Sequence, residues 1–201
     1  MIKFLRKSII CLCTICTALI FCCQVWAMSL SFNPSTSNIG IADMIDIDIV
    51  ASGLENTDLA TFDLNINYDN SILSFDSYTF TDSLGDVNAG DTSDWSWGDD
   101  GFGTLNLAEL SWLWDFSFQD DSFVLATVTF LGNEVGISPL FFSDVILGDN
   151  WGSPLYYTLN TGLVEVTAPV PEPATMILLS SGLLGFGIFR RKSIKLRRVY
   201  G

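Results

Sequence analysis

The side chains that could do chemistry in the central part of this chain are carboxylates and aromatic rings. All nine Lys and Arg residues lie within residues 3–7 or 190–198, all five Cys residues lie within residues 11–23, and the chain has no His. Residues 28–169 therefore lack the usual general bases, amine and thiolate nucleophiles, and guanidinium clamps for phosphates. They also lack the cations that neutralise a phosphate backbone, which excludes nucleic acid as a partner.

Carboxylates are numerous enough for a catalytic-looking pair to arise by chance. Residues 28–169 hold 22 of the 23 acidic residues, all except Glu172. Glu109 and Asp115 have the residue types that a carboxylate-based glycosidase uses, but in so acidic a chain some such pair is almost guaranteed. We therefore expect a protein that is not an enzyme and keep a glycosidase as the less favoured alternative.

The same excess of carboxylates raises the question of a structural cation. Ca²⁺ takes about six to eight oxygen ligands from carboxylates, carbonyls and water. The clusters that offer such oxygens are Asp99 with Asp100, Asp120 with Asp121, and Asp144 with Asp149. None of them has the spacing of an EF-hand loop. A structural Ca²⁺ and a plain solvated acidic surface that keeps the protein soluble remain alternatives, and the sequence requires no other cofactor.

Aromatic rings supply the second candidate site. Trp95, Trp97 and Phe102 fall in a segment rich in Gly and Asp, and exposed rings beside carboxylates suit sugars, whose apolar C–H faces pack on aromatic rings while their hydroxyls bond to oxygens. A core or loop-staple position stays the slightly favoured alternative for the two Trp residues, because large apolar rings are usually buried. Trp112 and Trp114 alternate with Leu113 and are expected in the core.

The elements that must position these residues are strands. Residues 28–168 alternate apolar and polar side chains, which is typical of strands with one buried face. The strands expected from this pattern cover residues 45–49, 62–68, 73–80, 110–118 and 124–130. A phase change near Ser77 predicts a bulge, and Asn160-Thr161-Gly162 predicts a hairpin turn between 157–159 and 163–166. Short strands separated by Gly, Asn and Asp turns favour an all-β sandwich.

One stretch resembles a known group of sandwiches. Residues 62–75 read Phe-x-Leu-x-Ile-x-Tyr-Asp-x-x-x-Leu-x-Phe, and residues 142–149 read Phe-Ser-Asp-Val-Ile-Leu-Gly-Asp. Together with the Ile-rich run from Ile45, they resemble strands of cohesin-like and carbohydrate-binding-module-like jelly rolls. The resemblance implies a jelly-roll β-sandwich of about nine strands over residues 28–168, in a group whose members bind proteins or polysaccharides.

The N-terminal segment has the composition of a signal peptide. Lys3, Arg6 and Lys7 precede an apolar run, and Val25-Trp26-Ala27 offers small residues to a signal peptidase. We expect cleavage between Ala27 and Met28, so that residues 1–27 are removed. All five Cys residues leave with this segment, and the mature domain then has no disulfide and no thiolate metal site.

The C-terminal segment has three parts in a fixed order. Val170-Pro171-Glu172-Pro173 is followed by an apolar stretch, residues 174–189, and then by the basic cluster Arg190-Arg191-Lys192. The apolar stretch is expected to form a transmembrane helix that is somewhat shorter than a hydrocarbon core. The basic cluster and the tail, residues 193–201, are expected on the cytoplasmic side.

This order resembles the PEP-CTERM sorting signal of Gram-negative bacteria, over about residues 169–192. The resemblance implies recognition by an exosortase after export, transient anchoring in the inner membrane, and a final place at the cell surface or in the extracellular matrix. Members of that family are associated with exopolysaccharide and biofilm.

The sequence thus predicts an exported protein whose β-sandwich is a non-catalytic binding or adhesion module for a glycan or a protein partner. A purely structural matrix protein without a discrete ligand is the alternative.

Overall fold

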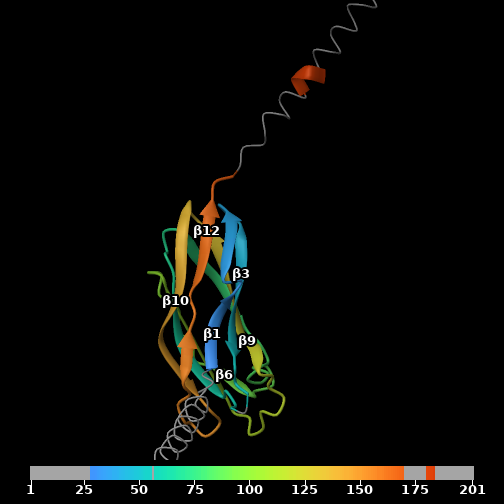
Figure 1. Ribbon diagram of the computed structural model, residues 1–201, viewed down its shortest axis with the longest axis vertical. Helices are drawn as coiled ribbons and strands as arrows, with labels where there is room; N and C mark the ends of the chain where they lie inside the picture. The colour runs from blue at the N-terminus through green and yellow to red at the C-terminus, as the bar shows by residue number, and fades with distance from the viewer. Residues whose placement is uncertain (1–27, 56, 170–179, 184–201) are drawn as a thin grey trace, which may run out of the picture.

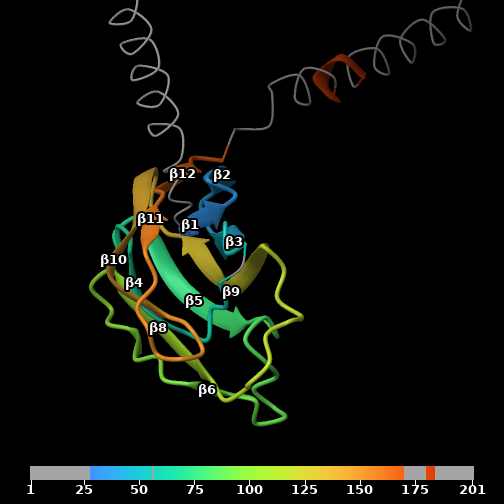
Figure 2. The ribbon, with the colours of Figure 1, turned by 60° about the horizontal axis from the view of Figure 1, so that its bottom comes forward.

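Two β-sheets pack face to face in this protein (Figure 1; Figure 2). The computed structural model describes residues 28–55, 57–169 and 180–183. The predicted signal peptide, the Val170–Pro173 motif, the Arg190–Lys192 cluster and the basic tail lie outside the described residues. So does most of the predicted transmembrane helix, of which only residues 180–183 are described, as one helical turn. Within the part of the chain that the structure describes, no helix has both the length and the apolar character needed to cross a membrane.

The first sheet has five strands and contains the start of the domain. Its strands, in spatial order, are β11 (Tyr157–Leu159), β1 (Met28–Asn33), β3 (Met44–Ser52), β9 (Ser122–Gly132) and β5 (Leu73–Phe80). Neighbouring strands are antiparallel except β1 and β11, which run parallel.

The second sheet has seven strands. Their order is β2 (Thr36–Gly40), β12 (Gly162–Thr167), β10 (Gly136–Gly148), β4 (Thr61–Asn67), β8 (Thr104–Ser111) and β6 (Thr92–Asp94), with β7 (Gly98–Asp99) also paired to β8. Here β2 and β12 are the parallel pair. The all-β sandwich expected from the sequence is confirmed.

The core lies between the sheets and follows the alternation of the strands. In β4, Phe62, Leu64 and Ile66 are buried. Burying each such side chain stabilises the folded state by roughly 1.5–3 kcal/mol relative to leaving it exposed. The described residues include no Lys, Arg or His, so no ion pair forms among them. On the outer face of the five-stranded sheet, Thr129 Oγ1 instead donates a hydrogen bond to Asp46 Oδ1 at 2.7 Å across neighbouring strands.

Two details of the strand predictions have opposite outcomes. The bulge near Ser77 is confirmed, because the pairing of β5 with β9 shifts between Phe75 and Ser77. The strand predicted over residues 110–118 is wrong, because β8 ends at Ser111. The chain turns there as the Trp112 N–H donates to the Asp91 carbonyl at 2.8 Å, and residues 112–121 form a loop.

The hairpin predicted around residues 160–162 is also wrong. β11 and β12 belong to different sheets. The Asn160 N–H donates to the carbonyl of Leu30 in β1, whereas the Leu163 N–H donates to the carbonyl of Ser35 just before β2, both at 2.9 Å. The turn residues therefore carry the chain from one sheet to the other, parallel to the passage from β1 to β2.

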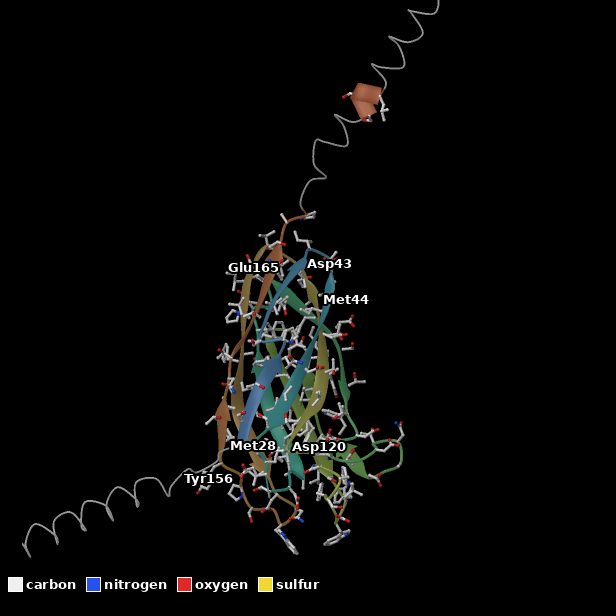
Figure 3. All side chains as sticks on the ribbon, turned by 45° about the vertical axis from the view of Figure 1, so that its right-hand side comes forward. Met28, Asp43, Met44, Asp120, Tyr156 and Glu165 are labelled. Carbon is white, nitrogen blue, oxygen red and sulfur yellow. The ribbon has the colours of Figure 1, made fainter. Side chains whose placement is uncertain are left out.

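The sandwich is elongated, and its two ends differ. Met28, Asp120 and Tyr156 lie at one end, whereas Asp43, Met44 and Glu165 lie at the other (Figure 3). Strand β12 runs toward the second end, where the described domain stops at residue 169 (Figure 1).

Candidate binding face

A row of hydrogen-bonded polar side chains crosses the outer face of the seven-stranded sheet. Asn106 on β8 donates from Nδ2 to Asp63 Oδ1 at 2.8 Å and to Asn65 Oδ1 at 3.0 Å, both on β4. Asn65 in turn donates from Nδ2 to Asp144 Oδ2 on β10 at 3.0 Å. We call these four residues the polar ladder. Three strands that are distant in sequence thus hold one set of amide and carboxylate groups in fixed positions at the surface.

Further polar contacts lie next to the ladder on the same three strands, β4, β8 and β10. Asn67 donates from Nδ2 to Ser143 Oγ at 2.8 Å, and the Thr104 hydroxyl donates to Asn67 Oδ1 at 3.4 Å. These side chains are half-buried or exposed. The sequence contains one signal of this site, the Asp and Asn residues at alternate positions of β4, but that pattern by itself predicts only the solvent-exposed face of a strand.

A bulge in β10 places Asp144 in the ladder. The pairing of β10 with β4 shifts between Ser143 and Ile146, and Asp144 has a φ of 50°. Asp is one of the few residue types that tolerate this left-handed conformation, and bulges commonly redirect a side chain beside a functional surface. The bulge therefore turns the Asp144 carboxylate toward Asn65.

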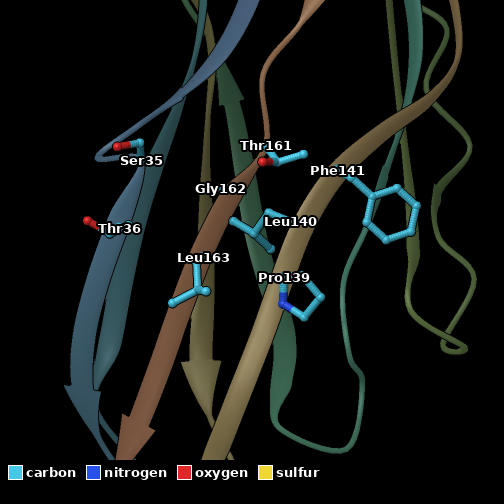
Figure 4. A pocket seen from close by; sticks show the side chains of 8 residues that line it. All are labelled: Ser35, Thr36, Pro139, Leu140, Phe141, Thr161, Gly162 and Leu163. Carbon is cyan, nitrogen blue, oxygen red and sulfur yellow. The ribbon is translucent and has the colours of Figure 1, made fainter.

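An apolar hollow adjoins the ladder on the other side of β10. It has a volume of about 520 Å³ and is shown in Figure 4. It is lined by Ser35, Thr36, Pro139, Leu140, Phe141, Thr161, Gly162 and Leu163. Phe141 links the two features, because its carbonyl accepts a hydrogen bond from Asn67 Nδ2 at 3.3 Å. The outer face thus combines a polar centre with an apolar flank.

The aromatic residues predicted to bind sugars border the opposite side of the ladder. Trp95, Trp97 and Phe102 are 62%, 92% and 85% exposed, so the core alternative for the two Trp residues is wrong. The Trp97 N–H donates to Asn106 Oδ1 at 3.0 Å, and the Trp95 N–H to the Ala108 carbonyl at 2.8 Å. The segment that contains both residues therefore lies alongside β8 at the edge of the sheet. Their role in sugar binding stays a prediction.

Two of the predicted calcium ligands fix the turn that carries Phe102. Asp99 accepts a hydrogen bond from the Tyr68 hydroxyl at 2.6 Å, and burial followed by this contact raises the pKa of Tyr68 above its usual range. Asp100 accepts the N–H groups of Phe102 and Thr104 at 2.7 and 3.0 Å, which lowers the pKa of the Asp100 carboxyl.

The other predicted calcium ligands lie in separate places. Asp121 accepts the Glu55 N–H at the end of the sandwich, where Asp120 is also found. Asp149 accepts the N–H groups of Trp151 and Ser153 at 2.9 and 2.7 Å in the loop after β10. Among the residues that the structure describes, no three acidic side chains come together in a group that could hold a metal ion. The Ca²⁺ site stays a prediction.

Glu109 is the only buried acidic side chain among the described residues. It is 1% exposed, and neither carboxylate oxygen has a hydrogen-bond partner. Burial raises the pKa of Glu109 to about 7, and the negative charges of Asp94 and Asp82 add to the rise. Asp115 instead lies in the exposed loop after β8. Glu109 is thus closed off from any substrate that could reach Asp115.

Trp112 and Trp114 are not in the core. They are 56% and 90% exposed in the loop after β8. The prediction is wrong because other residues anchor this loop to the domain. Phe116 is the residue of the loop that is buried. The Gln119 side-chain amide accepts from the Leu59 N–H at 3.0 Å and donates to the carbonyls of Leu59 and Ser83 at 2.7 and 3.0 Å.

Comparison with known proteins finds similarities for the C-terminal segment and for the β-sandwich domain. Residues 169–192 match the family described as the PEP-CTERM protein-sorting motif. No curated protein sequence matches the chain.

Several solved cohesins share the fold of the domain. The cohesin CaCohA2 of Clostridium acetobutylicum, solved in complex with CaDoc0917, is 18% identical with a TM-score of 0.60, over 70% of this chain and 100% of that chain. The seventh ScaB cohesin of Pseudobacteroides cellulosolvens is 15% identical with a TM-score of 0.58, over 72% and 95%.

The sixth cohesin of Acetivibrio cellulolyticus scaffoldin B, solved in complex with the Cel5 dockerin, is 16% identical with a TM-score of 0.56, over 70% and 99%. At these identities the likeness shows the fold. The chain therefore joins a cohesin-like β-sandwich to a C-terminal PEP-CTERM protein-sorting motif.

Proposed function

We propose that this protein is an exported, non-catalytic binding module that holds a protein partner on the outer face of its seven-stranded sheet. The polar ladder carries the proposal, because its amides and carboxylates are already paired and oriented before any ligand arrives. The sorting motif supports export and processing by an exosortase, with a working place at the cell surface or in an exopolysaccharide-rich matrix. Three of the similar cohesin structures are complexes with dockerins, which supports a protein as the partner.

The composition of the face agrees with a protein interface. Interfaces combine apolar and aromatic anchors with hydrogen-bonding groups, and here the ladder lies between the apolar hollow and the exposed Trp97. Because the described residues carry no positive side chain, the surface would attract a partner with a basic patch, which speeds association at low salt.

A glycan bound at the sheet edge is the second candidate function. The observation that favours it is the exposure of Trp95, Trp97 and Phe102 beside the amide of Asn106. A structural matrix role without a ligand remains the alternative if neither surface binds anything.

A charge reversal within the ladder tests the proposal. Asp63→Lys removes one of the acceptors of Asn106 Nδ2 and places a cation at the centre of the face, so we expect it to abolish capture of the partner from the extracellular matrix of the producing cells. The matched control is Asp46→Lys, which removes an exposed strand carboxylate with a cross-strand donor at 2.7 Å on the other sheet. The protein is purified from its own cells and used as bait, and captured proteins are identified by mass spectrometry.

The control should capture the same partner as the unchanged protein. Equal capture by both variants, or loss with Asp46→Lys alone, would remove the seven-stranded face as the binding surface. Equal melting temperatures of the two variants would show that the difference does not come from unfolding.

A further inference from the structure

Five exposed aromatic residues gather in two loops at the end of the sandwich opposite residue 169. Trp112, Trp114 and Phe118 belong to the loop after β8, and Trp151 and Tyr156 to the loop after β10. We call these five residues the aromatic tip. The side chains of Trp151 and Tyr156 are 82% and 86% exposed. A group of large rings in contact with water is unusual, because such rings are usually mostly buried.

The order of the strands brings the two loops close together. The Ala60 N–H donates to the Gly148 carbonyl at the end of β10, and the Ser111 N–H at the end of β8 donates to the Ala60 carbonyl, both at 2.9 Å. The two loops therefore begin on either side of the segment before β4, about 10 Å apart at two strand spacings.

Hydrogen bonds and ring packing fix the two loops that carry these rings. The Trp112 indole N–H donates to Ser93 Oγ at 2.9 Å, and the Asp149 carboxylate fixes the turn that presents Trp151. Phe118 stacks on the buried Phe116 with ring centroids 6.1 Å apart. The Gln119 amide ties the same loop to two neighbouring segments. A surface fixed in this way loses little conformational entropy on binding.

Position and charge restrict what the tip can bind. The sorting motif begins at residue 169, at the other end of the domain, so a chain held by its C-terminal segment presents the tip away from its own membrane. The described residues carry no cation, which disfavours nucleic acid, anionic lipids and anionic polysaccharides. An uncharged polymer rich in hydroxyls suits rings flanked by carboxylates, because its C–H faces pack on the rings and its hydroxyls donate to oxygens.

We propose that the aromatic tip binds a neutral polysaccharide. The residues of the tip differ from those of the sheet face proposed for a protein partner and from Trp95 and Trp97 at the sheet edge. A chain with both sites connects a protein partner to a glycan matrix.

Affinity electrophoresis in native gels tests this site with the protein purified from its own cells. The gels contain hydroxyethylcellulose or galactomannan as neutral polymers, or alginate as an anionic one. The tip variant combines Trp114→Ala with Trp151→Ala. The matched control combines Met44→Ala with Val135→Ala, which removes two exposed apolar side chains outside the tip and outside the sheet face. A third variant, Trp95→Ala with Trp97→Ala, tests the sheet edge as the alternative site.

We expect at least one neutral polymer to retard the unchanged protein and the control, alginate to retard neither, and the tip variant to bind at least about tenfold more weakly, which corresponds to about 1.4 kcal/mol. Absence of retardation by both neutral polymers overturns the proposal. So does retardation of the tip variant equal to that of the unchanged protein, or loss in the Trp95 and Trp97 variant alone, which would move the site to the sheet edge. Binding to phosphatidylcholine vesicles that the tip variant loses would identify a lipid surface instead and would also overturn it.

Discussion

Replacing Glu109 by Gln is expected to remove a loss of stability that the unchanged protein shows as the pH rises from about 4.5 through 7. The Glu109 carboxylate is buried without a hydrogen-bond partner, and its pKa rises from 4.5 to about 7 on folding. Because one pKa unit corresponds to about 1.4 kcal/mol, the ionised form costs the folded state on the order of 3 kcal/mol. This is a large fraction of the stability of an ordinary domain.

The direction of the pH dependence follows from the raised pKa. Between pH 4.5 and 7 the folded protein binds a proton that the unfolded chain has released, so stability falls as the pH rises. The contribution of Glu109 is fully present below pH 4.5 and is lost as the pH passes through about 7. Asp94 and Asp82 are the charged groups that add to this effect from β6 and from the loop before it.

Urea unfolding at pH 5 and pH 8 measures the effect. We expect the free energy of unfolding of the unchanged protein to fall over this range by on the order of 3 kcal/mol more than that of Glu109→Gln. The control is Glu165→Gln, an exposed glutamate of β12, which changes the net charge equally and should keep the full pH dependence. A Glu109→Gln variant with the same pH dependence as the unchanged protein would show that Glu109 is not the responsible group.

Replacing Gly103 by Ala is expected to have the second large effect, a loss of about 3 kcal/mol in the free energy of unfolding. Gly103 has a φ of 99°, and a Cβ atom there would lie far inside van der Waals contact of the Tyr68 carbonyl oxygen. That backbone cannot retreat easily, because the Tyr68 N–H donates to the Gly103 carbonyl at 2.9 Å. The substitution therefore combines a left-handed conformation with a collision.

Gly101→Ala separates these two causes. Gly101 has a φ of 74° in the same turn, but a Cβ atom there meets nothing within 4 Å, so only the cost of the left-handed conformation remains, about 1 kcal/mol. Thermal and urea unfolding of both variants give the comparison. Equal losses in the two variants would show that the contact between Gly103 and Tyr68 does not restrict the turn.

The sequence predicted the sandwich because its strands have one buried and one wet face. In β4 the buried residues Phe62, Leu64 and Ile66 alternate with polar ones, and only a strand gives that period. The segment after Ser111 shows the limit of this reasoning. Its aromatic residues also alternate, but the chain leaves the sheet at Trp112, and alternation cannot distinguish a strand from a loop that presents rings to solvent.

The candidate binding face was less predictable, because it depends on which strands are neighbours. Asp63 and Asn65 are visible as polar positions of one strand, but their partner Asn106 is 43 and 41 positions away. Asp144 reaches Asn65 only because of the bulge in β10. Of the carboxylates grouped as calcium ligands by sequence proximity, Asp100, Asp121 and Asp149 instead accept hydrogen bonds from backbone N–H groups, which sequence spacing does not reveal.

Photo-crosslinking from single positions tests most directly where a partner binds. A photoreactive side chain is placed at Ile146, an exposed residue paired with Asp63 beside the polar ladder, or at Asp46 on the outer face of the five-stranded sheet, and the producing cells are irradiated. The proposed function predicts a protein adduct from position 146 and none from position 46. A protein adduct from position 46 alone, or no adduct from position 146, would contradict it.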